Sequence, residues 1–463
     1  MRTGLLLLVG SVLTFAQTPT EPPKFNGPGS CASPACHGGV GEISPTVAAQ
    51  QNLYYVQQNE YSIWVVKDKH ARAFSVLSND VAKRIYSLMT LTKGPEQEPR
   101  CLGCHALKVT DAEKARTFGD LTDGVSCESC HGPASNWLGG HTEKKWTHEE
   151  SVKQGMKDLR DPANRAENCL RCHLGDKDNS VDHELIAAGP PDLVFELTAF
   201  TAAMPKHWKE AGEKPNATPD PWFEVRELAT SEAVQLREQL KRVSRNAGGN
   251  FWPEYADLDC FACHHSLTTA ENSWQQKRGY PPLPNGLPAT GSLPPYGTGR
   301  HPGNPPWNLS RYVILRQVVG EEDPGSAREL ESDIDRLYGM ISSLNPDKGQ
   351  VTALANSTAE VAARLIPKLN TATYDQARTL RLMRAIVNSA DYITRLGERP
   401  AEQSAMALKV LYTAYAGQGK PAGDARIQQA IDGLLKSNYV ANPSAYDAFK
   451  FSDMMRAVGG MLP

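Results

Sequence analysis

Five short stretches of the chain combine two cysteines and a histidine in a nearly constant pattern. Four of them read C-x-x-C-H, while the first in chain order has four residues between its cysteines. C-x-x-C-H is the attachment motif of c-type haem, in which both thiols form thioethers and the histidine binds the iron. The motifs, numbered one to five along the chain, contain Cys31, Cys36 and His37; Cys101, Cys104 and His105; Cys127, Cys130 and His131; Cys169, Cys172 and His173; and Cys260, Cys263 and His264.

The cysteine count favours haem over other uses of these motifs. The chain has ten cysteines, and every one of them belongs to a motif. Zinc sites need four ligands, and they give no role to a histidine placed after every second cysteine. Disulfides in a secreted chain do not explain that histidine either. We therefore predict five covalent haem c groups, with a local disulfide as the alternative for the long motif one.

The amino terminus and the charge indicate where the protein works. Residues 1–16 resemble a secretory signal peptide, with Arg2 followed by an apolar run and a small-residue cleavage site at Ala16. We expect a secreted protein in the periplasm or outside the cell, with an uncleaved amino-terminal anchor as the alternative. The formal net charge of -3 and the lack of a basic cluster predict no nucleic-acid partner.

The elements that carry the motifs are expected to be mainly helical. Residues 17–274 should form a haem-organised pentahaem cytochrome domain with little regular sheet, because porphyrins would supply much of its apolar mass. Within it, Ser44–Met89 should be helical with a break at Ser78–Asp80. Residues 222–243 should form another helix.

The remainder of the chain has a different character. Residues 275–307 are rich in Pro and Gly and predict an extended linker. Residues 308–463 contain neither cysteine nor histidine, and they predict an all-α domain with a docking role. Expected helices lie at 325–344, 351–369, 422–436 and 444–457. Another should start at a capping box beginning with Thr373 and end at Gly397, and Pro400 should begin the next.

Seven histidines lie outside the motifs and are candidates for the second axial position of the irons. His265 follows a motif histidine directly, His148 lies in a charged run and should be solvated, and His301 lies in the linker. The better candidates are His70, His141, His183 and His207. Two axial histidines make an electron carrier, whereas a missing one leaves an open, reactive iron.

Residues 31–173 resemble the tetrahaem cytochrome c-554 family. The resemblance is closest from Gly124 to Pro133, continues to His141, and includes the His-Ala-x-Ala element at His70. It implies that His141 is the second ligand at motif one and His70 the second ligand at motif three. It also implies that the haem on His105 has no second ligand. Residues 183–265 resemble larger relatives with a fifth haem, and the tetrahaem protein has no counterpart of the helical domain.

Three functions are consistent with these observations. The first is electron transfer between periplasmic or membrane-bound redox proteins through closely spaced haems. The second is an oxidoreductase that acts on a nitrogen oxide or hydroxylamine-type molecule at the His105 haem. No motif reads C-x-x-C-K, so a lysine-ligated catalytic haem is not expected. The third is docking to a partner through residues 308–463.

Overall fold

The structure is a computed structural model. It describes residues 21–44, 46–47, 56–89, 91–190, 192–209, 220–250, 252–264, 305–343, 345–417, 424–436 and 445–463. The predicted signal peptide, residues 275–304 of the predicted linker, His265 and His301 lie outside the described residues.

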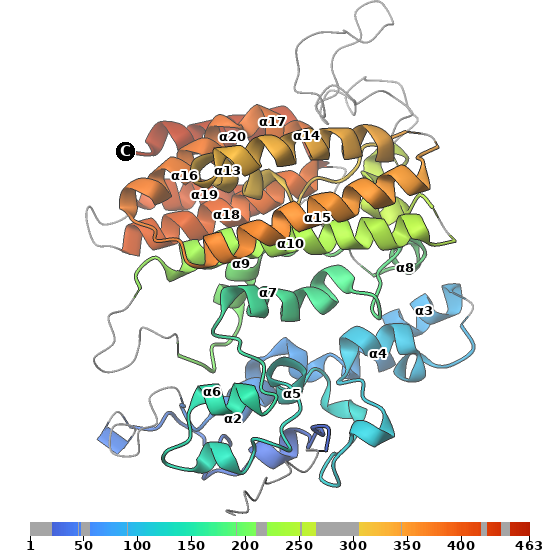
Figure 1. Ribbon diagram of the computed structural model, residues 1–463, viewed down its shortest axis with the longest axis vertical. Helices are drawn as coiled ribbons and strands as arrows, with labels where there is room; N and C mark the ends of the chain where they lie inside the picture. Colours follow the sequence, from blue (N-terminus) through green and yellow to red (C-terminus); the bar gives the residue numbers. More distant parts are fainter. Residues whose placement is uncertain are drawn as a thin grey trace, which may run out of the picture.

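Two parts of the molecule differ in the length of their helices (Figure 1). The blue to teal part, which reaches Gly175, consists of short helices and turns, whereas the later part is mostly a stack of long helices. In the described ranges, β-structure amounts to two isolated bridges, Phe25–Lys114 and Leu258–Trp307. The predicted mainly α fold with little regular sheet is confirmed.

The short elements of the first part follow each other closely. The segment predicted to be helical before Met89 forms two α-helices joined by tight turns over its described residues. The predicted break is confirmed, because Asn79 caps the second helix by accepting the Ala82 backbone N–H at 2.8 Å. The elements are η1 (Pro28–Cys31), α2 (Glu60–Lys67), η2 (Lys69–Arg72), η3 (Ser75–Ser78), α3 (Asp80–Leu88), η4 (Pro95–Gln97), α4 (Pro99–His105), η5 (Asp111–Glu113), η6 (Leu121–Asp123), α5 (Cys127–His131), η7 (Gly140–Thr142), α6 (His148–Lys153), α7 (Pro162–Leu170), η8 (Arg171–Gly175) and α8 (His183–Ala188).

Four of the motifs are wound into helical turns. Motif two ends α4, motif three is the whole of α5, and motif four begins in α7 and continues into η8. Motif five begins the short turn η11 (Cys260–Ala262). Residues three apart lie on one face of a helix, so the C-x-x-C spacing presents both thiols on the same side.

Motif one brings its ends together by a different route. Its two extra residues allow a turn in which the Cys36 N–H donates to the Ser33 carbonyl at 2.8 Å. The His37 N–H then donates to the Cys31 carbonyl at 3.3 Å. The longer spacing therefore closes into a compact loop that keeps the histidine beside the first cysteine.

The second part contains the longer helices, and several of them start at an acidic N-cap. A carboxylate there accepts free N–H groups at the positive end of the helix dipole. The four helices predicted between residues 325 and 457 are present with their ends shifted by a few residues, and Val313–Glu322 forms an additional one. The elements are α9 (Leu197–Ala203), α10 (Phe223–Gly248), η10 (Tyr255–Asp257), η11, α13 (Val313–Glu322), α14 (Pro324–Ile341), α15 (Lys348–Asn370), α16 (Gln376–Asn388), α17 (Ala390–Arg395), α18 (Glu398–Gly417), α19 (Ala425–Lys436) and α20 (Ala448–Met461).

The segment before α18 differs in detail from the prediction. We expected a cap at Thr373, but the N-cap of α16 is Asp375, whose carboxylate accepts a backbone N–H at 2.7 Å. The single helix that we expected is interrupted at Ser389, which separates α16 from α17. Gly397 follows α17 as predicted, with a φ of 120° that favours glycine. Pro400 lies in the first turn of α18, also as predicted.

One hydrophobic core runs through the second part and reaches into the first. Its central helix is α10, which lies along α15 (Figure 1) and also packs on α7 and α18. Leu228, Leu236 and Leu240 of α10 are each at most 1% exposed. The core includes Ala166, before the predicted linker, and Leu462, after it. Helices on both sides of the linker therefore share one core.

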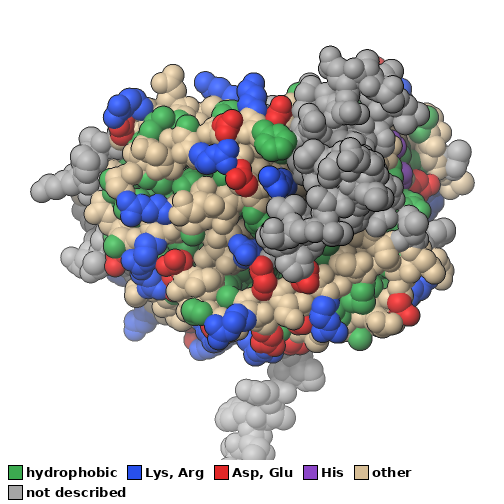
Figure 2. All heavy atoms as spheres, turned by 90° about the horizontal axis from the view of Figure 1, so that it is seen from above, with side chains coloured by type: hydrophobic (Ala, Val, Ile, Leu, Met, Phe, Trp, Pro, Cys, Tyr) green, Lys and Arg blue, Asp and Glu red, His purple; other side chains and the backbone are tan. Residues whose placement is uncertain are grey.

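The outer face of the helical stack is polar (Figure 2). Lysines, arginines and acidic side chains are interspersed over its visible part, and hydrophobic side chains lie scattered among them. Mixed charge of this kind is typical of a surface exposed to water.

Candidate functional site

Three pairs of histidine rings face each other at similar distances. Each pair joins a motif histidine to a histidine outside the motifs, and the two members of each pair are far apart in the sequence. The rings of the first pair are nearly parallel, with planes 6° apart. The centroid separations are 6.2 Å for His37–His141, 6.3 Å for His70–His173 and 6.0 Å for His183–His264.

These separations fit a metal ion held between two imidazoles. A bond from an imidazole nitrogen to a transition-metal ion is about 2 Å long, and the nitrogen lies roughly 1 Å from its ring centroid. Two rings on one ion therefore have centroids roughly 6 Å apart. The residues present at motifs one, four and five fit haem iron with two axial histidines.

Hydrogen bonds at Nδ1 fix the orientation of several of these rings. His37 Nδ1 lies 2.9 Å from Glu60 Oε2, and His70 Nδ1 lies 2.9 Å from Asp68 Oδ1. His141 Nδ1 donates to a backbone carbonyl one turn earlier at 2.6 Å. Metal-binding histidines commonly donate their second ring N–H to a carboxylate or carbonyl. These contacts leave Nε2 as the nitrogen available to a metal.

Burial and neighbouring carboxylates set the charge of the rings. Burial lowers the pKa of His173 to about 4 and that of His131 to about 4. The carboxylates named above raise the pKa of His37 and of His70 through their hydrogen bonds. Metals bind neutral imidazole. Burial therefore favours the neutral, metal-binding form of His173 and His131.

His207 is the candidate second ligand at motif three. After burial, it is the neighbour that most lowers the pKa of His131. Its own Nδ1 is buried and has no hydrogen-bond partner within the described part of the chain. A buried polar atom without a partner is costly, so something is expected to bind it.

His105 of motif two has a different setting. Its Nδ1 donates to the Ala73 carbonyl at 2.7 Å, which orients the ring like those of the other motifs. A small hydrophobic cluster of Leu77, Leu102 and Ala106 includes Leu102 of α4 and Ala106, which directly follows His105. Within the described ranges, the histidine–histidine ring contacts involve His37, His173 and His264, and neither His105 nor His131.

His148 is engaged elsewhere. Its Nε2 lies 3.0 Å from Asp158 Oδ1, which occupies the nitrogen that a ligand would use. We expected this residue to be solvated, but its side chain is only 17% exposed because the aspartate holds it against the molecule.

The position of His70 corrects an expectation drawn from the resemblance. We expected it opposite motif three, but its ring faces His173 of motif four. The Val125 N–H donates to the His70 carbonyl at 3.1 Å, so the backbone, not the ring, adjoins motif three. Gly124 permits this approach, because a Cβ there would lie 2.7 Å from the His70 carbonyl oxygen. Chain order alone does not say which motif the ring meets.

The motif cysteines lie close to one another. No disulfide joins any of the ten, all of which lie within the described residues. Cys31 lies beside Cys127 and Cys104 lies beside Cys172, so motif one adjoins motif three and motif two adjoins motif four. The motifs are thus arranged in adjacent pairs.

Glu128 is a site residue that the sequence pattern did not indicate. It lies between the cysteines of motif three, is 2% exposed, and its carboxylate accepts the N–H groups of Asn26 at 2.9 Å and Gly27 at 2.7 Å. These bonds tie the segment that leads into motif one onto motif three. Closeness in the sequence could have revealed Asp68, two residues before His70, but not Glu60, which is 23 residues from His37.

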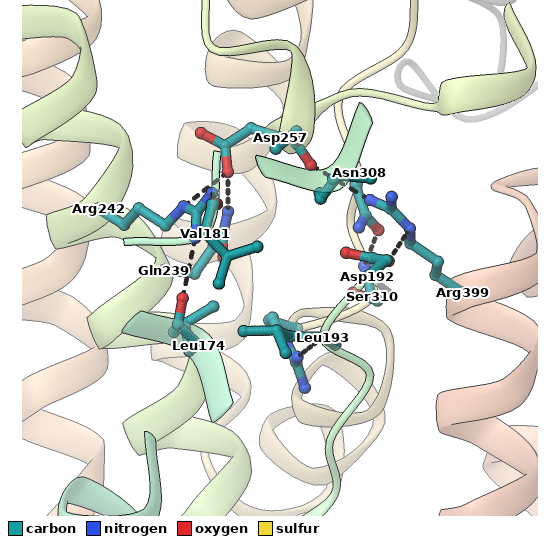
Figure 3. A pocket seen from close by; sticks show the side chains of 13 residues that line it. Leu174, Val181, Asp192, Leu193, Gln239, Arg242, Asp257, Asn308, Ser310 and Arg399 are labelled. Atoms are coloured by element: carbon teal, nitrogen blue, oxygen red, sulfur yellow. Dashed lines mark hydrogen bonds and ion pairs between the residues drawn. The ribbon is translucent and has the colours of Figure 1, made fainter. Parts of the chain in front are cut away.

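Motif five is held by residues of the second part, on α10 and at the end of the predicted linker. The Asp259 N–H donates to the Pro306 carbonyl at 2.8 Å, and the Asn308 N–H donates to the Asp257 carbonyl at 2.9 Å. The Asp257 carboxylate also accepts from Arg242 Nε of α10 at 3.1 Å (Figure 3). Motif five therefore contacts α10, the last residues of the predicted linker and the first residue after it.

Comparisons with known proteins bear on the first part. The family model described as cytochrome c554 and c-prime matches residues 56–132, which contain His70 and motifs two and three. Cytochrome c-554 of Nitrosomonas europaea is 32% identical over 113 residues. The chain is a c-type cytochrome that resembles the cytochrome c-554 family.

The similarity is confined to a minor share of this cytochrome. It covers 23% of the chain and 48% of the relative, so the chain spans about half the length of the curated relative that it matches. No solved structure matches the chain. Among the helices that the structure describes, none has the length and apolar character needed to cross a bilayer.

Proposed function

We propose that this cytochrome carries five covalent haem c groups and transfers electrons between redox partners outside the cytoplasm. Each haem would supply an iron that gains and loses one electron. The repeated pairing of a motif histidine with a second histidine, at 6.0–6.3 Å between ring centroids, carries the proposal. Two axial histidines leave no position for a substrate, which favours a carrier over an enzyme.

The residues of the chain have separate tasks in this proposal. The motif cysteines would anchor the cofactors, and the histidine pairs would hold the irons. Glu60 and Asp68 hold two of the rings in place through Nδ1. Export by a signal peptide at residues 1–16 belongs to the proposal, because c-type haem is attached outside the cytoplasmic membrane. The expected partners are periplasmic or membrane-bound redox proteins, which could dock on residues 308–463.

The haem of motif two supports a second candidate function. The described histidines outside the motifs lie near motif histidines other than His105, or, for His148, against Asp158. The resemblance to cytochrome c-554 likewise implies an open position there. An open position would favour oxidoreduction of a nitrogen oxide or hydroxylamine-type molecule.

The haem number and the open position can be measured on one sample. The mass of the purified protein should exceed that of its polypeptide by five haem groups, and peptide mapping should locate one of them on Cys31 and Cys36. Fewer than four haems would contradict the proposal. Reduced protein should bind one carbon monoxide if motif two is open, and none if every iron has two histidines.

Substitution of His141 tests the pairing directly. His141→Ala should remove the second ligand at motif one, so the reduced protein should bind one more carbon monoxide than the wild type. His148→Ala is the matched control, because its ring pairs with Asp158 and should leave carbon monoxide binding unchanged. Equal binding by His141→Ala and the wild type would show that His141 is not a ligand.

A further inference from the structure

A buried arginine from the helices that follow the predicted linker (α13 to α20, called the helical part below) contacts motif five. Arg399 lies in the first turn of α18, and its Nη2 is 3.0 Å from Cys260 Sγ. Its Nη1 donates to the Ala256 carbonyl at 3.3 Å, and its Nε forms an ion pair with Asp192. Figure 3 shows Arg399 extending from α18 toward Asp192, and both side chains line a small cavity. The residue is 7% exposed, so its charge is poorly screened by water.

The other charges around the cavity have their own partners. Arg242 pairs with Asp257 at 3.1 Å, and Arg311 donates to the Leu193 carbonyl at 2.7 Å and to Gln235 at 2.7 Å. The acidic groups near Arg399 are Asp192, Asp259 and Glu398. Of the basic residues around the cavity, Arg399 is the one that contacts Cys260.

The contact is part of how motif five is built. Cys260 precedes the motif histidine His264, whose ring faces His183 at 6.0 Å. The His183 N–H donates to Glu254, which caps the turn that contains Ala256. Arg399 therefore contacts Cys260 and also the turn that contains Ala256. Glu254, the cap of that turn, accepts the backbone N–H of His183, the histidine opposite His264.

We infer that Arg399 positions motif five and favours the reduced form of its haem. This inference rests on the proposed function, because it requires a haem on Cys260, Cys263 and His264. Reduction adds one electron from a one-electron donor, and no bond forms or breaks. A fixed positive charge beside the group that gains an electron stabilises the reduced form, and burial strengthens the effect. The helical part then contributes to a haem site as well as to the core.

Substitution of Asp192 should change the local charge in the opposite direction to substitution of Arg399. Its carboxylate neutralises part of the Arg399 charge across the ion pair. Removing the carboxylate should expose more positive charge to motif five, whereas removing the guanidinium should expose more negative charge. A merely structural role for the pair would not predict shifts of opposite direction.

The experiment compares full-length, haem-loaded variants by spectroelectrochemical redox titration. Arg399→Met should lower the equilibrium constant for reduction of one haem about tenfold, which is about 59 mV for one electron. Asp192→Asn should raise the potential of the same haem, and Arg399→Lys should stay near the wild type. Arg364→Met is the matched control, because this exposed arginine on α15 pairs with Glu329. It should shift no potential.

The outcomes separate this inference from the proposed function. Opposite shifts of one haem support the role of Arg399. No shift, or shifts in the same direction, in protein that carries five haems would overturn the inference and leave the electron-carrier function intact. A wild-type protein without haem on the Cys260–Cys263 peptide would overturn the haem assignment at motif five and the inference with it. If Arg399→Met does not fold, Asp192→Asn and Arg399→Lys decide.

Discussion

At the scale of single residues, the acceptor at Nδ1 differs among the motifs. Glu60 and Asp68 offer carboxylates to His37 and His70, whereas His105 donates to a backbone carbonyl. A carboxylate acceptor makes imidazole a stronger electron donor than a carbonyl does. A stronger donor stabilises oxidised iron. The carboxylates should therefore lower the reduction potentials at motifs one and four.

Asp68→Asn tests this effect at His70. The amide keeps an oxygen near Nδ1 but loses the negative charge, so the potential of one haem should rise. We expect a change of about tenfold in the equilibrium constant for reduction, or about 59 mV. A redox titration of the loaded protein would measure it.

Asp158→Asn is the control for this change. Asp158 also pairs with a histidine, at 3.0 Å, but that histidine is not a proposed ligand. A similar shift in both variants would show that any aspartate near the haems changes their potentials, and it would contradict a specific role for Asp68.

At the scale of elements, α10 is unusual because polar side chains are buried along it. Glu232 is fully buried, and its Oε1 accepts from Gln235 Nε2 at 3.1 Å and from Gln403 Nε2 at 2.9 Å. Burial raises the pKa of Glu232 to about 8, with Glu196 adding to the rise and Arg311 opposing it. Glu232 is therefore protonated in the folded protein at neutral pH.

This protonation makes stability depend on pH. The ordinary pKa of Glu232 is 4.5, so between about 4.5 and 8 the folded protein holds a proton that the unfolded chain releases. Stability must fall as pH rises through that window, by at most about 1.4 kcal/mol for each pH unit. Glu232→Gln should remove this loss, so the variant should gain stability over the wild type as pH increases. Melting temperatures of both proteins, measured from about pH 5 to about pH 8, would show this widening difference.

Glu329→Gln on α14 is the control for the Glu232 substitution. Glu329 forms an exposed pair with Arg364, and such pairs contribute about 0–1 kcal/mol. Its substitution should change the melting temperature little. A gap between Glu232→Gln and the wild type that stays constant with pH would contradict the buried, protonated state.

At the scale of the whole molecule, the helices that follow the predicted linker share one core with α7 and α10, which precede it. α10 precedes the predicted linker, yet its apolar side chains pack against helices that follow it. Burying one leucine or valine side chain contributes about 2 kcal/mol, whereas a whole domain is stable by about 5–15 kcal/mol. Losing the partners of several such side chains would therefore exceed the stability margin.

Removal of residues 305–463 should unfold α10 and disturb motif five. We expect the truncated protein to aggregate, and its remaining soluble fraction to lack the haem on Cys260 and Cys263. Haem counting by mass on that fraction, beside the full chain expressed in the same way, would measure the loss. A soluble truncated protein with all five haems would instead favour a helical part that serves docking alone.

The sequence by itself contains the five Cys/His motifs from which we predict haem attachment, and it predicted the mainly α fold. Both depend on local sequence. The C-x-x-C spacing spans one helical turn, and the periodicity of apolar residues indicates helices. Its resemblance to a known family also pointed to His141 for motif one, a partner that the ring geometry then placed beside His37.

Only the tertiary structure decided which distant groups meet. It set His70 against motif four, buried Glu128 beneath the segment leading to motif one, and brought Arg399 to Cys260. These partners lie far apart in the chain, and no spacing rule connects them. Their proximity depends on how the motifs and helices pack together, and local sequence patterns carry no information about that packing. For the same reason, the sequence did not predict that α10 and α15, which the linker separates, pack against each other in one core.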